Sequence, residues 1–315
     1  MDFMFSFVLS LHILSRYVTV SYSVENEFDK FILKYNKSYT NKHYEYQIRL
    51  QNFKQNFEVM IDILSTDLSH EEFKSLYLSD LKQSKIQKNE KWKTPNQKFG
   101  LLKVPLKVDW RSMENKNYIS PVKNQNKCGA CWAFASVETV ESMYSITTRK
   151  ETPLLNCADG NDGCNGGTTC NAFQWMNSSK TPIVSEKAYP LTDTSEYCTI
   201  LPNGTKGIQV QNYTCEYLVQ NEDRMLWLLA YVGPLTVAVD ATTWNNYMGG
   251  IIQYHCSASE NHAVQIVGYD ISGDIPYYIV KNSWGTDFGI HGYLHIKYGN
   301  NVCGIAQTVS TVSVL

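Results

Sequence analysis

The feature that most constrains this 315-residue chain is a short run, Cys-Gly-Ala-Cys-Trp, at positions 128–132. An apolar pattern of helical spacing follows it, which predicts a helix that begins at Cys131. A Cys-x-x-Cys spacing suits either a redox pair or a nucleophilic thiol beside a structural cysteine. His262 and Asn282 occur far downstream, and they are the partners that a nucleophilic Cys131 needs. The run therefore favours a cysteine hydrolase, and a disulfide oxidoreductase that uses Cys128 and Cys131 is the competing hypothesis.

The overall composition narrows the class of protein. A formal net charge of −2 argues against a nucleic-acid-binding surface, which needs a basic excess. The 43% hydrophobic content fits a chain with a buried core. Nine cysteines are many for a reducing compartment and indicate an oxidising one. Because nine is odd, at least one thiol is left unpaired, as a nucleophile would be.

The N-terminus agrees with entry into the secretory pathway. An apolar run over residues 3–14 is followed by small and polar residues up to Ser23, which predicts a signal peptide over residues 1–23. The run is shorter than the roughly 20 residues that a membrane span needs, and no later segment is long enough. We therefore expect a lysosomal or extracellular protein. Secretory entry would make four sequons usable for glycosylation: Asn36, Asn177, Asn203 and Asn212.

The patterns along the chain divide it into an N-terminal segment, 24–103, and a domain, 104–315. Residues 25–64 carry apolar side chains at helical spacing, with Glu45 and Arg49 as a stabilising (i, i+4) pair. Residues 81–100 are polar and rich in lysine, as expected of a linker open to proteolysis. The domain begins with helical patterns and continues with strand-like segments at 235–239, 262–267, 277–280 and 292–296. A helix-rich half and a β-rich half suggest two subdomains with a cleft between them.

Four residues could together carry out acyl transfer. A thiol attacks a carbonyl only as thiolate, and the start of a helix at Cys131 favours that anion. His262 could hold the proton as imidazolium and later donate it to a leaving amine. Asn282 could accept from one ring nitrogen and fix the ring orientation. Gln125 could donate its side-chain amide to the developing oxyanion, together with the backbone N–H of Cys131.

From about Val104 to the C-terminus, the chain resembles the papain-like cysteine peptidases of the lysosomal cathepsin group. The stretches that carry the resemblance are 125–132, 261–263 and 281–285, with the His and Asn at the roughly 130–150-residue spacing from the Cys that this group has. The resemblance implies an α+β, papain-like fold of two subdomains, one helical and one an antiparallel, barrel-like β-structure. It also implies that residues 24–103 are a helical inhibitory propeptide.

The same resemblance assigns roles to further residues. It implies that Trp284 covers the Asn282–His262 contact. It implies a substrate-binding set that comprises Gly166 and Gly167 as a backbone edge, with Thr168, Thr169, Ala238, Ala263 and Thr308 lining a pocket for an uncharged side chain; Glu260 near its rim could change this preference. It implies three disulfides, Cys128–Cys164, Cys157–Cys198 and Cys256–Cys303. Cys170 and Cys215 remain, and they either form an extra bridge or are both free.

We therefore expect a cysteine endopeptidase made as a zymogen, which hydrolyses polypeptides without a metal or cofactor. Its expected partners are polypeptide substrates, its own propeptide and protein inhibitors of cysteine proteases, and it is expected to be a monomer without nucleic-acid binding. Two stretches depart from the family pattern, residues 61–68 and 150–157. These departures motivate the alternative of a catalytically inactive, cathepsin-like binding protein.

Overall fold

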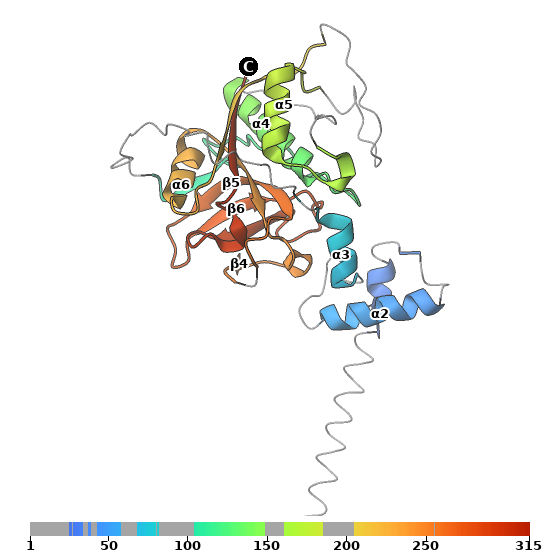
Figure 1. Ribbon diagram of the computed structural model, residues 1–315. Coiled ribbons are helices and arrows are strands. Elements are labelled where there is room, and N and C mark those ends of the chain that lie inside the picture. The colour runs from blue at the N-terminus through green and yellow to red at the C-terminus, as the bar shows by residue number, and fades with distance from the viewer. Residues whose placement is uncertain are drawn as a thin grey trace, which may run out of the picture. The chain divides into compact units, whose positions relative to one another are not determined.

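The computed structural model describes residues 25–26, 28–33, 37–38, 43–57, 68–79, 81, 104–148, 161–184, 205–254 and 256–315 (Figure 1). The chain divides into two compact units, residues 1–73 and 74–315. Several predictions lie outside the described residues: the signal peptide, most of the linker before residue 104, the sequons at Asn36 and Asn203, and the Cys157–Cys198 pair. Both departures from the family pattern also fall almost entirely outside them.

The N-terminal unit contains helical residues 28–33 and α2 (His43–Phe57). Their apolar side chains form one buried cluster, in which the rings of Phe28 and Phe53 lie 5.0 Å apart. Arg49 pairs with Glu72 at 2.6 Å, at the start of α3 (His70–Tyr77). Ser69 and Glu72 exchange backbone-to-side-chain hydrogen bonds of 2.8 and 3.2 Å, and this capping box begins α3. The periodicity that predicts helices in this segment therefore matches the structure.

Two helices of the second unit, α4 (Cys131–Thr148) and α5 (Thr169–Ser179), lie beside each other (Figure 1). Thr168 caps α5, because its hydroxyl accepts from the Asn171 amide at 3.2 Å. The apolar faces of both helices share a buried cluster with β2 (Val210–Glu216) and β8 (Val309–Val314). The other helical elements in the described part of this unit are α6 (Glu222–Tyr231) and three short 3-10 turns, η1 (Gly163–Asn165), η2 (Trp244–Asn246) and η3 (Val302–Gly304).

The remaining strands are β1 (Lys107–Asp109), β3 (Leu235–Val239), β4 (Ile251–Ile252), β5 (His262–Asp270), β6 (Tyr277–Lys281) and β7 (Tyr293–Lys297). They form one sheet in the order β2-β8-β3-β5-β6-β7-β4, and β1 pairs with β5. The four predicted strands are all present. The expected antiparallel β-structure is present, but the described strands leave the sheet open between β2 and β4, and β4 pairs with β7 in parallel.

Three disulfides join the described part of the second unit. Cys128–Cys164 and Cys256–Cys303 are the pairs that the resemblance implies. Cys170 and Cys215, which the sequence left open, form a third bridge between α5 and β2. Within the described residues, no helix has the length and apolar character to cross a membrane.

This framework places the candidate residues at element ends. Cys131 opens α4, His262 opens β5, and Asn282 directly follows β6. Strands β5 and β6 are neighbours in the sheet, and α4 packs on β5. Residues separated by more than 100 positions in the sequence are therefore brought to one place.

Candidate active site

Cys131 lies at the first position of α4 and is fully buried. Among the described cysteines, it alone is not in a disulfide. The start of an α-helix carries a partial positive charge, which favours an anion at this sulfur. The neighbouring indole fixes the helix start, because Trp132 Nε1 donates to the Gly163 carbonyl at 3.1 Å. Cys128, three residues earlier, is held by its disulfide to Cys164, so it is not a partner thiol for exchange.

His262 and Asn282 form a buried pair. The His262 Nε2 and Asn282 Oδ1 atoms lie 2.8 Å apart, so the amide oxygen accepts from this ring nitrogen. The other nitrogen, Nδ1, is buried and makes no hydrogen bond within the described residues. The Trp284 ring lies 4.7 Å from the imidazole at an angle of 33° and covers it. The ring is thus fixed on one side and free to exchange a proton on the other.

The electrostatics of this buried site favour neutral groups. Burial lowers the pKa of His262 to about 4, although the hydrogen bond with Asn282 opposes the shift. Burial likewise raises the pKa of the Cys131 thiol, and contacts with Ser79 and the Ala263 backbone offset this only partly. Both shifts disfavour the thiolate–imidazolium pair expected from the sequence. Burial therefore favours the uncharged forms of both groups while they are covered.

Gln125 is fully buried, and its amide is held at both ends. Its Oε1 accepts from the Ser283 hydroxyl at 2.6 Å, and its Nε2 donates to the Cys128 carbonyl at 2.9 Å. Nε2 also donates to the Tyr77 carbonyl at 3.4 Å. The same NH₂ group therefore holds the loop before Cys131 and binds a carbonyl oxygen from an earlier part of the chain.

That earlier part, residues 77–79 and 81, is called the covering segment below. Ser79 Oγ lies 3.5 Å from Cys131 Sγ, and the Ser79 amide donates to the Asn261 carbonyl at 3.0 Å. Leu81 packs against Cys131, Ala135 and Ala263. These contacts cover the thiol with main chain and side chains and account for part of its burial.

The close approach of the Cys164 carbonyl explains the glycine of the motif. A Cβ on Gly129 would lie 3.1 Å from the Ser79 Cβ and 2.4 Å from the Cys164 carbonyl oxygen. The second contact is impossible for a real side chain, so position 129 must be glycine.

The predicted substrate-binding residues fall into two groups. Ala238 and Ala263 are direct register partners in β3 and β5, and the Ala238 amide donates to the Thr308 carbonyl at 3.2 Å. The other group, Gly166, Gly167, Thr168 and Thr169, runs from η1 into α5. A Cβ on Gly167 would meet the Asn161 amide at 2.5 Å, and the same amide oxygen accepts from the Thr168 backbone at 2.7 Å.

Glu260 lies beside the first of these groups. The Glu260 Oε1 atom is buried and makes no hydrogen bond within the described residues. Burial raises the pKa of this carboxyl group, and a hydrogen bond with Thr308 opposes the shift. The sequence predicts Glu260 near the rim of the substrate pocket, but it does not indicate the contact with Thr308.

Sequence reasoning missed three residues that support the site. Ser283 orients Gln125, and Ser79 contacts the thiol. The third is Asp240, which accepts from the Asn261 side chain at 2.9 Å and from Ser257 at 2.6 Å. Burial alone would raise the pKa of Asp240, but hydrogen bonds from Thr242 and Ser257 outweigh it and lower the pKa to about 2. A signal for Ser283 exists, since it follows Asn282 directly, whereas Ser79 and Asp240 stand in no recognisable motif.

The described residues contain no group of three or more His, Cys, Asp or Glu side chains that could hold a metal ion. The side chains gathered at the site supply one thiol, one imidazole and two carboxamides, from Cys131, His262, Asn282 and Gln125.

Comparisons with known proteins point to one family. A family model described as papain family cysteine protease matches residues 104–313. Cathepsin O from Homo sapiens is 41% identical over 251 residues, which are 78% of this chain and 76% of that protein. Cathepsin O from Mus musculus is 39% identical over the same length.

A solved structure of a digestive procathepsin L2 from the Tenebrio molitor larval midgut superposes with a TM-score of 0.78 at 29% identity. It covers 92% of this chain and 99% of its own, so the likeness extends into the segment before residue 104. The family match spans most of the chain and includes Cys131, His262 and Asn282. This chain therefore belongs to the papain family of cysteine proteases.

Proposed function

We propose that this papain-family peptidase is an endopeptidase of the secretory pathway, lysosomal or secreted, made as a precursor that its own residues 24–103 keep inactive. The observation that carries the proposal is the arrangement of His262, whose Nε2 is held by Asn282 at 2.8 Å while Nδ1 is left without a partner. A base fixed on one side and free on the other, near a helix-start thiol, suits general acid–base catalysis of acyl transfer.

In the proposed mechanism, Cys131 loses its proton to His262 Nδ1 once the covering segment has left. The thiolate attacks the scissile carbonyl carbon, and the oxyanion accepts from Gln125 Nε2 and the Cys131 backbone N–H. The imidazolium gives its proton to the leaving amine, so the peptide bond breaks and a thioester remains. Water, deprotonated by His262, then attacks the thioester, releases the carboxylic acid and restores the thiol.

The covering segment supports the precursor part of the proposal. It brings the Tyr77 carbonyl to the Gln125 amide at 3.4 Å and the Ser79 amide to the Asn261 carbonyl at 3.0 Å. A bound polypeptide would use these same groups, so the covering segment excludes substrate. The likeness to a procathepsin structure over 92% of this chain agrees with such a role.

Processing and glycosylation complete the proposal. We place the signal peptide at residues 1–23 and the start of the mature domain near Val104. Of the two described sequons, Asn212 is exposed on the edge strand β2, whereas Asn177 is half-buried within α5. Asn212 is therefore the better acceptor for a bulky glycan.

The test is to express the precursor, acidify it, and assay peptide cleavage with and without an epoxide that traps thiols. We expect cleavage to appear together with loss of the N-terminal segment, and peptide mapping to find the label on Cys131. Full activity of Cys131→Ser would contradict the mechanism. A folded mature chain that fails to label at acid pH would support the alternative, an inactive binding protein.

A further inference from the structure

The helix that begins with the nucleophile carries two buried acidic residues. Glu138 and Glu141 lie on α4 with exposed fractions of 1% and 2%. Carboxylates are almost never fully buried unless they are paired, because removal from water is costly. Each therefore needs a cationic partner within the domain.

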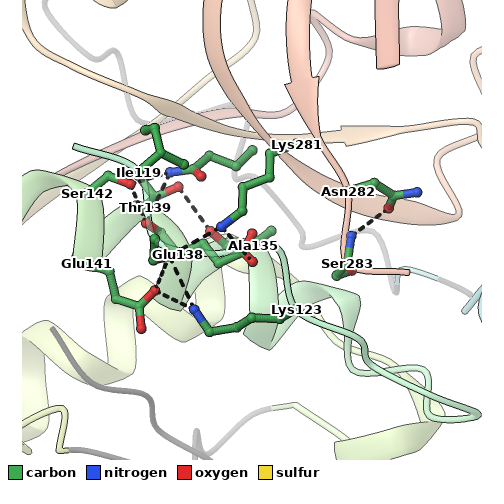
Figure 2. A network of polar contacts seen from close by, with 12 residues as sticks. Ile119, Lys123, Ala135, Glu138, Thr139, Glu141, Ser142, Lys281, Asn282 and Ser283 are labelled. Carbon is green, nitrogen blue, oxygen red and sulfur yellow. Dashed lines mark hydrogen bonds and ion pairs between the residues drawn. The ribbon is translucent and has the colours of Figure 1, made fainter. Parts of the chain in front are cut away.

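Each acid has a lysine partner (Figure 2). A serine, Ser120, connects the two pairs. Lys281 Nζ lies 2.9 Å from Glu138 Oε1, and Lys123 Nζ lies 2.7 Å from Glu141 Oε2. Ser120 Oγ donates to Glu141 at 2.6 Å and accepts from both lysines at 3.2 Å. These five side chains are called the buried charge network below.

The network continues into the central strand of the sheet. Gln265 Nε2 donates to the Glu138 carbonyl at 3.0 Å and to the Ser142 hydroxyl at 2.9 Å. Gln265 is also the register partner of Lys281 between β5 and β6. Helix α4 and strands β5 and β6 are thus joined around the Glu138–Lys281 ion pair.

Members of the network, and Gln265 bonded beside it, lie on the same four segments as the proposed catalytic residues. Glu138 lies two turns after Cys131 on α4, Gln265 follows His262 in β5, Lys281 directly precedes Asn282, and Lys123 lies two residues before Gln125. The Lys123 carbonyl also accepts from the Gly285 amide at 2.9 Å, beside Trp284. No other polar cluster described above reaches all four segments.

We propose that the buried charge network positions the catalytic residues, with the Glu138–Lys281 pair holding the helix that bears Cys131 in register with the strand that leads to Asn282. This inference rests on the proposed function of these residues. A buried ion pair is no more stabilising than apolar side chains of similar volume, so stability alone does not account for it. The 2.9 Å ion pair, together with the hydrogen bonds from Gln265 to the Glu138 carbonyl and to Ser142, instead selects one position of α4 along the sheet. Glu138 and Lys281 are positioning residues, because neither contacts the reacting atoms.

The experiment compares the mature enzyme with the double variant Glu138→Leu/Lys281→Met, which removes both charges and keeps the volume. The matched control is Glu216→Leu/Arg224→Met, which removes a 2.6 Å ion pair between β2 and α6, elements without a catalytic residue. We expect the first double variant to fold, with kcat reduced about tenfold and KM within about twofold, because small displacements of reacting groups cost rate. The control should keep the wild-type kcat.

The rate at which iodoacetamide alkylates Cys131 is measured across pH on the same samples. A displaced imidazole slows alkylation near neutral pH, whereas a purely structural defect does not change this profile. The profile is independent of peptide cleavage, so it distinguishes failure of the inference from failure of the proposed function. An inactive mature wild type contradicts the function, and an unchanged alkylation profile contradicts the inference.

A second variant covers the case in which the double variant does not fold. Ser120→Ala removes the hydroxyl that accepts from Lys281 Nζ at 3.2 Å, so the Lys281 ammonium is less firmly held against Glu138. A reduced kcat with an altered alkylation profile supports the inference. A wild-type kcat and profile in Ser120→Ala, or in the folded double variant, overturns it.

Discussion

The domain contains two buried polar pairs that are equally shielded from water and differ in how they are satisfied. His262 and Asn282 are both fully buried, and one ring nitrogen makes no hydrogen bond within the described structure. Lys281 and Glu138 are buried to the same degree, yet their opposite charges lie 2.9 Å apart. In the first pair, the His262 Nδ1 atom stays available for proton exchange. In the second pair, the two opposite charges fix each other's position.

The source of burial also differs between the nucleophile, Cys131, and the Glu138–Lys281 pair. The covering segment contributes to the burial of Cys131 through Ser79 and Leu81, and this part of the burial ends when the segment leaves. Lys281 and Glu138 are enclosed by α4 and the sheet, which remain. Burial lowers the pKa of Lys281, and the nearby Glu138 carboxylate opposes that shift. A group that must titrate in use is thus covered reversibly, whereas a group that must stay charged is paired permanently.

The largest expected effect comes from removing only one partner of the Glu138–Lys281 pair. Lys281→Met leaves the Glu138 carboxylate buried without its cation, which costs about 3–5 kcal/mol of unfolding free energy. The double variant Glu138→Leu/Lys281→Met should regain most of this loss. Urea unfolding of the mature domain measures both values. If Lys281→Met is as stable as the wild type, water or another cation reaches Glu138. The contrast between a permanently enclosed ion pair and the His262–Asn282 pair would then be wrong.

A second expected effect is that the stability of the covered form depends on pH. The pKa of His262 is about 4 in the covered form. We expect it to rise toward its ordinary value of 6.5 when the covering segment leaves, so the neutral ring stabilises the covered form fully above about pH 6.5. As the pH falls from 6.5 toward 4, only uncovered chains take up the proton, and the covered form loses about 1.4 kcal/mol per unit of pKa difference. Acid should therefore release the covering segment.

Hydrogen exchange of the Ser79 amide measures this release in a Cys131→Ala precursor, which cannot process itself. We expect exchange to accelerate as the pH falls through this window, after correction for the intrinsic rate. The control is Cys131→Ala/His262→Gln, in which the pH dependence over this window should disappear. Persistence of the same dependence in the control would assign the release to another group.

The parts of this structure that the sequence predicted depend on local patterns. Helix α4 and four strands follow from side-chain periodicity, and the Cys131, His262 and Asn282 positions follow from motifs around each residue. The open sheet could not be predicted in this way. Whether β2 and β4 pair depends on non-local strand order, which periodicity does not encode.

The buried charges were missed, and the third disulfide was left open, for a related reason. Glu138 and Lys281 have the residue types of a solvated surface, and only the packing of α4 on the sheet buries them. Cys170 and Cys215 bridge because their Cα atoms come within 6.1 Å, a separation set by α5 and β2 together. Ser79 belongs to no motif, so its contact with the thiol required coordinates.

A third expected effect tests the role of Asn282 in holding His262. Asn282→Ala in the mature enzyme removes the acceptor for His262 Nε2 and leaves the ring free to turn beneath Trp284. We expect kcat to fall on the order of 10- to 100-fold with little change in KM, because the substrate does not contact Asn282. Steady-state kinetics measure this change. A rise in KM at constant kcat would instead place Asn282 in substrate binding.

The smallest expected effect tests a single contact of the covering segment, the one between Ser79 and Cys131. Ser79→Ala removes the hydroxyl that lies 3.5 Å from Cys131 Sγ and leaves the Ser79 backbone bond to Asn261 intact. One hydrogen bond contributes about 0.5–1.5 kcal/mol, so iodoacetamide should alkylate Cys131 in the precursor a few-fold faster. Ser112→Ala, in an exposed turn, is the control and should not change the rate. An unchanged rate in Ser79→Ala would mean that the backbone bond and Leu81 hold the cover without the hydroxyl, and that the thiol is shielded by packing alone.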